Sequence, residues 1–245
     1  MNDGYRITWL SPSDAPDAFP DIELAVHEPE GLLAAGGDLG STRLLAAYRR
    51  GIFPWYEEGQ PILWWSPNPR CVIRPGCLHV AKRLQRELRH STAEYSFDGD
   101  FSTVVNACAE PRESGQGTWI TRDMAAAYRR LHDEGWAHSV EIWQGDRLIG
   151  GMYGIAIGCV FFGESMFSRE SNASKFALLA LTRWLFAHDF VILDCQVVSQ
   201  HLLSLGAVTM PRREFAELLR SECVPARRFL TWPSGRLDVR ELATP

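Results

Sequence analysis

The fold of this chain is decided by residues 147–197, which read RLIGGMYGIAIGCVFFGESMFSRESNASKFALLALTRWLFAHDFVILDCQV. Two apolar runs interrupted by glycine, 148–153 and 155–162, open this stretch. Runs of this length and composition predict two buried strands, and we expect them to form a hairpin that turns near Gly154.

A helix and a third strand complete the unit. Apolar residues recur at helical spacing over 172–187, and Ser171 or Asn172 is placed to cap the first turn. Residues 190–197 then alternate between two faces in the manner of a strand. The stretch is therefore expected to form a β-β-α-β unit.

Polar side chains stand at the ends of the predicted strands. By alternation, Asp194 and Gln196 share one face and emerge side by side at the end of the third strand. Glu164 follows the second strand of the hairpin. Taken singly, Glu164 fits the start of a loop and Asp194 fits a cap on a neighbouring element. Together they favour a cleft, which is where α/β folds usually place ligands, although geometry alone does not name the chemistry.

Length and composition describe a globular chain. Of its 245 residues, 46% are hydrophobic, so the chain can bury one large core or two modest ones. The net charge of −5 and the pI near 5.8 argue against a protein that coats nucleic acid indiscriminately. Any contact with nucleic acid must therefore be a local patch.

The cysteines and the lack of long apolar runs indicate the cellular compartment in which the protein is expected. The six cysteines form no C-x-x-C pair and lie mostly in apolar runs, so we interpret them as small buried hydrophobes in a reducing compartment. No metal-ligand spacing occurs, and we assign no metal. The first residues do not read as a signal peptide, and no run reaches the roughly 18 apolar residues of a membrane span. These features predict a cytoplasmic protein without membrane contact.

One segment is basic in this acidic chain. Residues 79–90 read HVAKRLQRELRH and predict a helix whose apolar stripe lies opposite a cluster of cations. The cluster comprises Lys82, Arg83, Arg86 and Arg89. Most charge runs are only solvated faces, but the local reversal of sign favours contact with a phosphate backbone.

Two tryptophans lie at unusual places. Trp55 sits between Pro54 and a charged loop, where its ring fits either a small domain core or a stack on a base at a pocket mouth. Trp119 is delivered by a loop to the entrance of a helix predicted over 121–134.

A set of long motifs, in fixed order along nearly the whole chain, resembles the bacterial leucyl/phenylalanyl-tRNA-protein transferases of the N-end rule pathway. The motifs are EPEGLLAAGGDL at 28–39, RGIFPWY at 50–56, PILWWSPNPR at 61–70, GTWI at 117–120, AHSVE at 137–141, GGMYG at 150–154, FFGESMFS at 161–168, NASK at 172–175 and LDCQV at 193–197. The resemblance implies an α+β fold. It consists of a small N-terminal domain, 1–68, and an acetyltransferase-like (GNAT) catalytic domain, 69–245, with a mixed sheet flanked by helices.

The resemblance also implies the reaction and its partners. Leu, and less often Phe or Met, would pass from an aminoacyl-tRNA to the α-amino group of a protein whose N-terminal residue is Arg or Lys. The product would then be degraded. No cofactor is implied, and we expect the protein to act as a monomer.

The residue types agree with this reaction. An aminoacyl ester is already activated, so the enzyme mainly holds an amine against the carbonyl carbon and stabilises the oxyanion. An α-amine has a pKa near 7.7 to 8.0, so about a tenth of it is neutral at pH 7 and no strong base is needed. By the resemblance, Asp194 and Gln196 assist deprotonation of the amine. Gln196 would act as base or as orienter, and proton transfer to the tRNA end is the alternative. Glu164 suits the cationic N-terminal residue or its α-ammonium.

Donor selection calls for an apolar slot. The predicted lining consists of Met152, Met166, Leu178 and Leu181, although the methionines fit an ordinary core equally well.

By the resemblance, Trp55 and Trp119 pack around the terminal adenosine or the aminoacyl group. Asn172 and Ser168 would also bind substrate. The basic helix would grip the acceptor stem through phosphates.

Two other functions compete with this one. A CoA-dependent N-acetyltransferase would share the fold, but the Gly-rich turn that holds pyrophosphate is replaced by SRESNASK at 168–175. A non-catalytic tRNA-binding module would have no reason to place Asp194 and Gln196 in a cleft.

Overall fold

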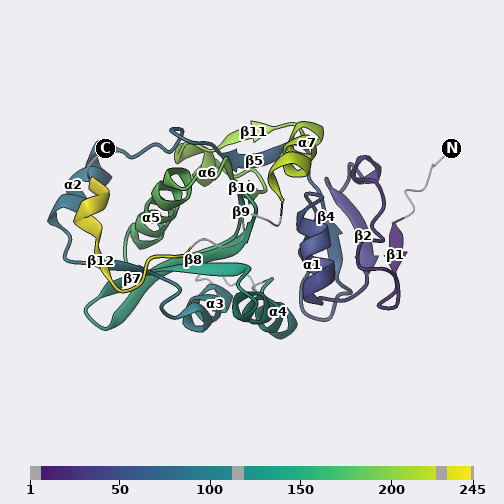
Figure 1. The fold of residues 1–245 in the computed structure, drawn as a ribbon, viewed down its shortest axis with the longest axis horizontal. Coiled ribbons are helices and arrows are strands. Elements are labelled where there is room, and N and C mark those ends of the chain that lie inside the picture. Colours follow the sequence, from purple (N-terminus) through teal and green to yellow (C-terminus); the bar gives the residue numbers. More distant parts are fainter. Residues whose placement is uncertain (1–6, 112–118, 225–230, 244–245) are drawn as a thin grey trace.

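The computed structural model describes residues 7–111, 119–224 and 231–243, and these contain two sheets (Figure 1). The first sheet has four strands in the order β1-β2-β4-β3, and helix α1 belongs to the same part of the chain. β1 and β2 are parallel, and the other pairs are antiparallel. The elements are β1 (Thr8–Leu10), β2 (Leu32–Gly36), α1 (Ser41–Tyr48), β3 (Phe53–Pro54) and β4 (Leu63–Trp65).

The second sheet has eight strands in the order β11-β5-β10-β9-β8-β7-β6-β12. Among the described strands, β9 and β10 pair in parallel and the other neighbours are antiparallel, so the sheet is mixed. The strands are β5 (Arg70–Ile73), β6 (Glu94–Phe97), β7 (Ala137–Gln144), β8 (Arg147–Ile157), β9 (Val160–Ser168), β10 (Ile192–Gln196), β11 (Val208–Met210) and β12 (Leu237–Asp238).

Helices cover both faces of the second sheet (Figure 1). One face packs α3 and α4 in a core with Tyr153 and Ile155, and the other packs α5 in a core with Ile149 and Met152. None of the described helices is both long and apolar enough to cross a membrane. The helices are α2 (Lys82–His90), α3 (Phe101–Ala109), α4 (Arg122–Asp133), α5 (Ala173–Ala187), α6 (Gln200–Ser204) and α7 (Arg212–Glu222), with short 3-10 turns at Ile22–Leu24 and Val239–Ala243.

This arrangement confirms the α+β fold with a mixed sheet flanked by helices. The two sheets divide between Trp65 and Arg70, while α1 contacts α4, so the N-terminal elements adjoin the α3/α4 face of the larger sheet. The division into domains 1–68 and 69–245 stays a prediction.

The hairpin forms as expected but turns at a different glycine. β8 continues through Gly154 to Ile157, and Gly158, with φ of 60°, begins the turn. Gly154 instead lies where β8 and β9 approach closely, since an added Cβ would come 2.2 Å from the carbonyl oxygen of Phe162. A glycine inside a strand marks such an approach or a bulge as often as a turn, which is why the sequence alone misplaced the corner.

The start of α5 also differs in its cap. Asn172 occupies the N-cap position in a left-handed conformation and makes no capping bond. The hydroxyl of Ser168 accepts the N–H of Ser174 at 2.8 Å in its place. Gly150 allows this end of the helix to rest on β8, because an added Cβ would lie 2.4 Å from the Cβ of Ala173.

Candidate active site

Glu164 is the centre of a hydrogen-bonded cluster to which four elements contribute. Its Oε1 accepts hydrogen bonds from the hydroxyl of Tyr48 at 2.8 Å and from Nε2 of Gln196 at 2.9 Å. Its Oε2 accepts one from the hydroxyl of Tyr128 at 2.6 Å, and the two tyrosine oxygens lie 2.7 Å apart. Side chains from α1, α4, β9 and β10 therefore meet at one carboxylate, where the first sheet's helix adjoins the second sheet.

A β-bulge in β9 places Glu164 there. Ser165 opposes Tyr153 and Gly163 opposes Gly154, so Glu164 is an extra residue with no opposite partner in β8. A bulge redirects the side chain of the strand that contains it. Glu164 was expected after the end of the strand, whereas it lies within β9 and turns toward α1 and α4.

Burial raises the pKa of Glu164 from 4.5 to about 7, because the ionised carboxylate loses the solvation of water. The negative charge of Asp194 adds to this rise, and the hydrogen bonds from Tyr128, Tyr48 and Gln196 oppose it. The same burial, followed by the charge of Glu164, raises the pKa of both tyrosines well above 10, so they stay neutral donors.

The hydrogen-bond count fits a carboxyl group that titrates near neutral pH. Three short oxygen-oxygen contacts join Tyr48, Tyr128 and Glu164, whereas the two hydroxyls carry only two protons. A protonated Glu164 supplies the third proton, and an ionised Glu164 leaves one contact without a proton. All three contacts therefore hold a proton only when Glu164 is protonated.

Gln196 ends β10 with its side-chain amide held in one orientation. Its φ of 62° lies in the left-handed region, which is uncommon for a residue with a side chain. Its backbone N–H donates to Oδ1 of Asp194 at 2.9 Å, and Nε2 donates to Glu164. The side chain is only 8% exposed, and its Oε1 has no hydrogen-bond partner among the described residues. That oxygen remains as an acceptor for an incoming N–H group.

Asp194 holds the end of β10 in place. It is fully buried and forms a bidentate ion pair with Arg70, with Nε to Oδ1 at 2.8 Å and Nη2 to Oδ2 at 2.6 Å. The guanidinium also donates to the carbonyl of Gly51 at 2.8 Å and lies between the rings of Phe53 and Phe215. A carboxylate with these partners is held as a fixed acceptor for the N–H of Gln196.

Asp194 therefore does not emerge beside Gln196 as strand alternation predicted. In the pairing of β10 with β5, Asp194 opposes Val72 and Gln196 opposes Cys71, which leaves Cys195 as an extra residue. This second bulge breaks the two-residue period. Asp194 reaches Gln196 through its backbone N–H and not through its side-chain amide.

A cavity of about 210 Å³ is lined by Val197 and Val198, which directly follow Gln196 at the end of β10. Trp55 forms part of its wall, is 41% exposed and lies 5.5 Å from the ring of Trp65. This placement favours the pocket-mouth interpretation of Trp55 over the core interpretation. Trp119 is partly buried against the hydrophobic core just before α4.

The four residues expected to line the donor slot lie together on the α5 face. Met152, Leu178 and Leu181 are buried in one core cluster, and Met166 packs against it while partly exposed. Met152 lies close to the backbone of Gly163, the residue before Glu164. A Cβ added to Gly163 would come 4.0 Å from the methyl group of Met152.

The remaining predicted residues gather at a separate place, around the start of α5 and along α2. Ser168 stands four residues beyond Glu164 along β9, which corresponds to about 13 Å of strand. Asn172 donates to Glu87 of α2 at 2.9 Å. α2 buries its two leucines and exposes all four predicted cations, Lys82, Arg83, Arg86 and Arg89.

Sequence reasoning missed Tyr48, Tyr128 and Arg70. Both tyrosines lie on the buried faces of amphipathic helices, where they read as ordinary core residues. A buried tyrosine hydroxyl usually needs a polar partner, which is the only signal the sequence offered. Arg70 closes the PNPR motif, but its partner Asp194 lies 124 positions further along the chain.

Comparison with known proteins gives consistent matches. The family model described as leucyl/phenylalanyl-tRNA protein transferase matches residues 72–220, and the model of its N-terminal domain matches residues 37–68. A leucyl/phenylalanyl-tRNA-protein transferase of Azotobacter vinelandii is 55% identical over 202 residues, which cover 82% of this chain and 89% of that protein. The protein of the same name in Pseudomonas paraeruginosa is 52% identical over 232 residues, which cover 95% and 99%.

Solved structures also match this chain. A GCN5-related N-acetyltransferase from Kribbella flavida aligns with a TM-score of 0.36 and 11% identity, covering 68% of this chain and 59% of that one. A likeness this low does not decide the fold by itself.

The fold, the carboxylate-amide site and the matches together define an aminoacyltransferase. The chain belongs to the leucyl/phenylalanyl-tRNA-protein transferase family, as its motifs indicated.

Proposed function

We propose that this protein transfers Leu, and also Phe and Met, from aminoacyl-tRNA to the α-amino group of proteins that begin with Arg or Lys, and that the product is marked for degradation. The observation that carries the proposal is the contact between Glu164 and Gln196, 2.9 Å long. It presents a carboxylate and a free amide oxygen from two neighbouring strands. An amine that approaches the ester can donate an N–H group to either acceptor.

The reaction needs positioning more than chemical activation. In the reaction the amine nitrogen forms a bond to the carbonyl carbon, the ester C–O bond breaks, and the departing ribose oxygen takes up one proton. Oε1 of Gln196 is placed to accept an N–H of the amine and so to direct its lone pair at the carbonyl. Gln196 thus acts as orienter in this proposal. Asp194 and Arg70 act as positioning residues, since they hold the backbone of Gln196.

Glu164 serves the acceptor protein. When ionised, it attracts the α-ammonium or the cationic side chain of an N-terminal Arg or Lys. With a pKa of about 7, it is also able to receive a proton that the ammonium loses. The hydroxyls of Tyr48 and Tyr128 keep its two oxygens in place in both states.

The donor would lie on the other side of Gln196. The exposed ring of Trp55 and the cavity beside Val197 suit the terminal adenosine. Trp119, which packs against the hydrophobic core, would approach the same end of the donor. The cluster of Met152, Met166, Leu178 and Leu181 lies next to β9 and suits an unbranched or γ-branched apolar side chain.

The tRNA body would rest on α2. Its exposed cations, Lys82, Arg83, Arg86 and Arg89, provide a phosphate-binding face in a chain whose net charge is −5. Contacts to phosphates carry no base preference, so one surface would serve several tRNAs. Cytoplasmic location and action as a monomer stay predictions.

Transfer of radiolabelled Leu from charged tRNA to short peptides tests the proposal. Peptides that begin with Arg or Lys should accept Leu, and the same peptides with an acetylated N-terminus should not. Equal transfer to peptides that begin with Ala or Glu would contradict the acceptor assignment. Binding of acetyl-CoA in calorimetry, without transfer of Leu, would favour the N-acetyltransferase alternative.

A further inference from the structure

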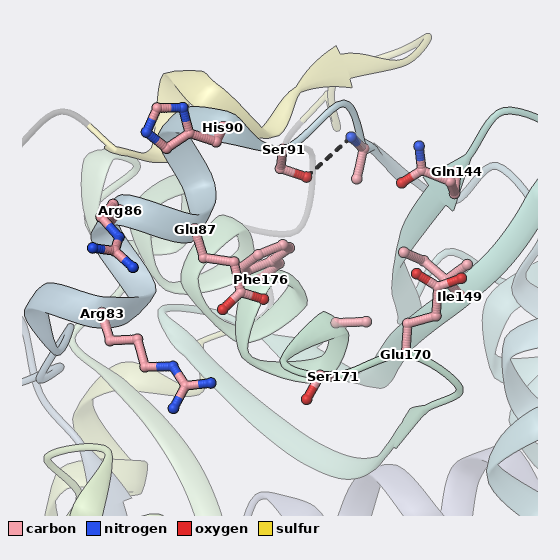
Figure 2. A pocket seen from close by; sticks show the side chains of 12 residues that line it. Arg83, Arg86, Glu87, His90, Ser91, Gln144, Ile149, Glu170, Ser171 and Phe176 are labelled. Atoms are coloured by element: carbon pink, nitrogen blue, oxygen red, sulfur yellow. Dashed lines mark hydrogen bonds between the residues drawn. The ribbon is translucent and has the colours of Figure 1, made fainter.

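A second, larger cavity of about 450 Å³ lies apart from Glu164, between α2, the start of α5 and the adjoining ends of β7 and β8. Figure 2 shows Arg83 and Arg86 along one side, Gln144 and Ile149 along the other, and Phe176 at the back. The volume lies within the range of about 300–1,000 Å³ that ligand pockets occupy. The proposed function uses Arg83 and Arg86 as part of an exposed basic face but assigns no ligand to the cavity itself.

The charges around the cavity are unequally compensated. Its two carboxylates are engaged, since Glu87 accepts a hydrogen bond from Asn172 at 2.9 Å and Glu170 pairs with Arg147. Among the residues that the structure describes, neither Arg83 nor Arg86 forms an ion pair or a hydrogen bond. The cavity therefore offers two available guanidinium groups, which suit a phosphate.

The floor of the cavity is apolar although its rim is charged. Phe176, Ile149 and Ala173 line it and are each at least 95% buried by the rest of the protein. Gln144 and Ser91 add an amide and a hydroxyl at the same rim. Phosphate-binding cations, an apolar floor and a few hydrogen-bonding groups are the features that a single unstacked nucleotide needs.

The start of α5 does not itself provide the anion site. The N–H of Ala173 bonds to the carbonyl of Glu170, the N–H of Ser174 to the hydroxyl of Ser168, and the N–H of Lys175 to the carbonyl of Asn172. The phosphate would therefore be held by the side chains of α2.

We propose that this cavity receives one unpaired nucleotide from the acceptor end of the donor tRNA, upstream of the terminal adenosine, with its phosphate at Arg83 and Arg86 and its base against the floor. The inference rests on the proposed function, because it takes tRNA as the donor. The position is suitable, since Ser168, which bonds to Ser174 at the start of α5 beside the cavity, lies about 13 Å along β9 from Glu164. The pocket would thus guide the single-stranded end toward the transfer site.

Filling the cavity tests this inference. Ser171 is exposed, lines the cavity and can be replaced by a large ring, so Ser171→Trp should occupy the space without unfolding the protein. We expect kcat/KM with leucyl-tRNA to fall about tenfold or more, the size of one lost base contact, while kcat/KM with leucyl-adenosine changes less than about twofold. Ser102→Trp, on the exposed side of α3, is the matched control and should leave both donors unaffected.

Charge variants on α2 provide the second measurement. Arg83→Ala and Arg86→Ala should weaken tRNA binding more than Lys82→Ala and Arg89→Ala, which lie on the same helix outside the cavity. Equal losses for all four variants would overturn the pocket and leave only a general basic face. Equal losses with both donors for Ser171→Trp would also overturn it. No transfer from either donor by the unaltered protein would instead refute the proposed function. Tight binding of CoA that Ser171→Trp abolishes would assign the cavity to a cofactor and overturn the inference.

Discussion

Replacing Glu164 with Gln should remove a pH-dependent loss of stability. The pKa of this carboxyl is 4.5 in its ordinary environment and about 7 in the folded protein, where burial is the largest cause. Below pH 4.5 the folded and unfolded chains both hold the proton. Between pH 4.5 and 7 the unfolded chain releases it and the folded chain keeps it, so rising pH favours unfolding. Above pH 7 both chains are ionised and the penalty is constant.

The size of the effect follows from the shift. Each pKa unit corresponds to 1.36 kcal/mol, so the penalty for ionised Glu164 reaches about 3 kcal/mol above pH 7. That amount is a large part of the stability of an ordinary domain. Glu164→Gln is neutral at every pH and keeps one acceptor and one donor group for Tyr48 and Tyr128, so its stability should lack this loss.

Urea denaturation from pH 4.5 to 8.5 measures the difference. The free energy of unfolding of Glu164→Gln minus that of the unaltered protein should rise by about 3 kcal/mol across this range. Glu58→Gln, in an exposed loop, controls for the change in net charge. If the two stability curves stay parallel within about 0.5 kcal/mol, the buried carboxyl does not titrate near pH 7 and the reasoning is refuted.

Three further changes separate the roles of the site residues. Asp194→Asn should destabilise the protein by about 3–5 kcal/mol in denaturant, because it leaves Arg70 buried without a counter-charge; a loss below about 1 kcal/mol would show that the pair does not anchor β10. Tyr128→Phe removes a hydrogen bond that lowers the pKa of Glu164, so the acidic limb of the kcat/KM profile should move to higher pH; an unshifted limb would separate Glu164 from the rate. Met166→Trp should impair Phe transfer more than Leu transfer in a donor competition, and an unchanged ratio would place the donor slot elsewhere.

Local patterns determined much of the fold. Helical spacing of apolar residues predicted the helix found as α5, Ala173–Ala187, in which every residue from Phe176 to Thr182 is buried. The amphipathic pattern at 79–90 likewise gave the buried leucines and exposed cations of α2. The motifs FFGESMFS and LDCQV indicated the family and the two strands that contain Glu164 and Gln196. Each motif is a short continuous segment, so the sequence alone shows it.

The tertiary structure alone decided how the site is assembled. The bulges at Glu164 and Cys195 arise where β9 and β10 lose register with their neighbours, and register is a property of two strands that no single segment encodes. Tyr48 meets Glu164 across 116 positions, so nothing local marks the pair. Arg70, the partner of Asp194, lies 124 positions away in the chain. The sequence therefore predicted an exposed catalytic side chain at Asp194, whereas Asp194 is a buried member of an ion pair. Amphipathic periodicity is written locally, whereas the pairing of polar groups depends on which distant segments the fold brings together.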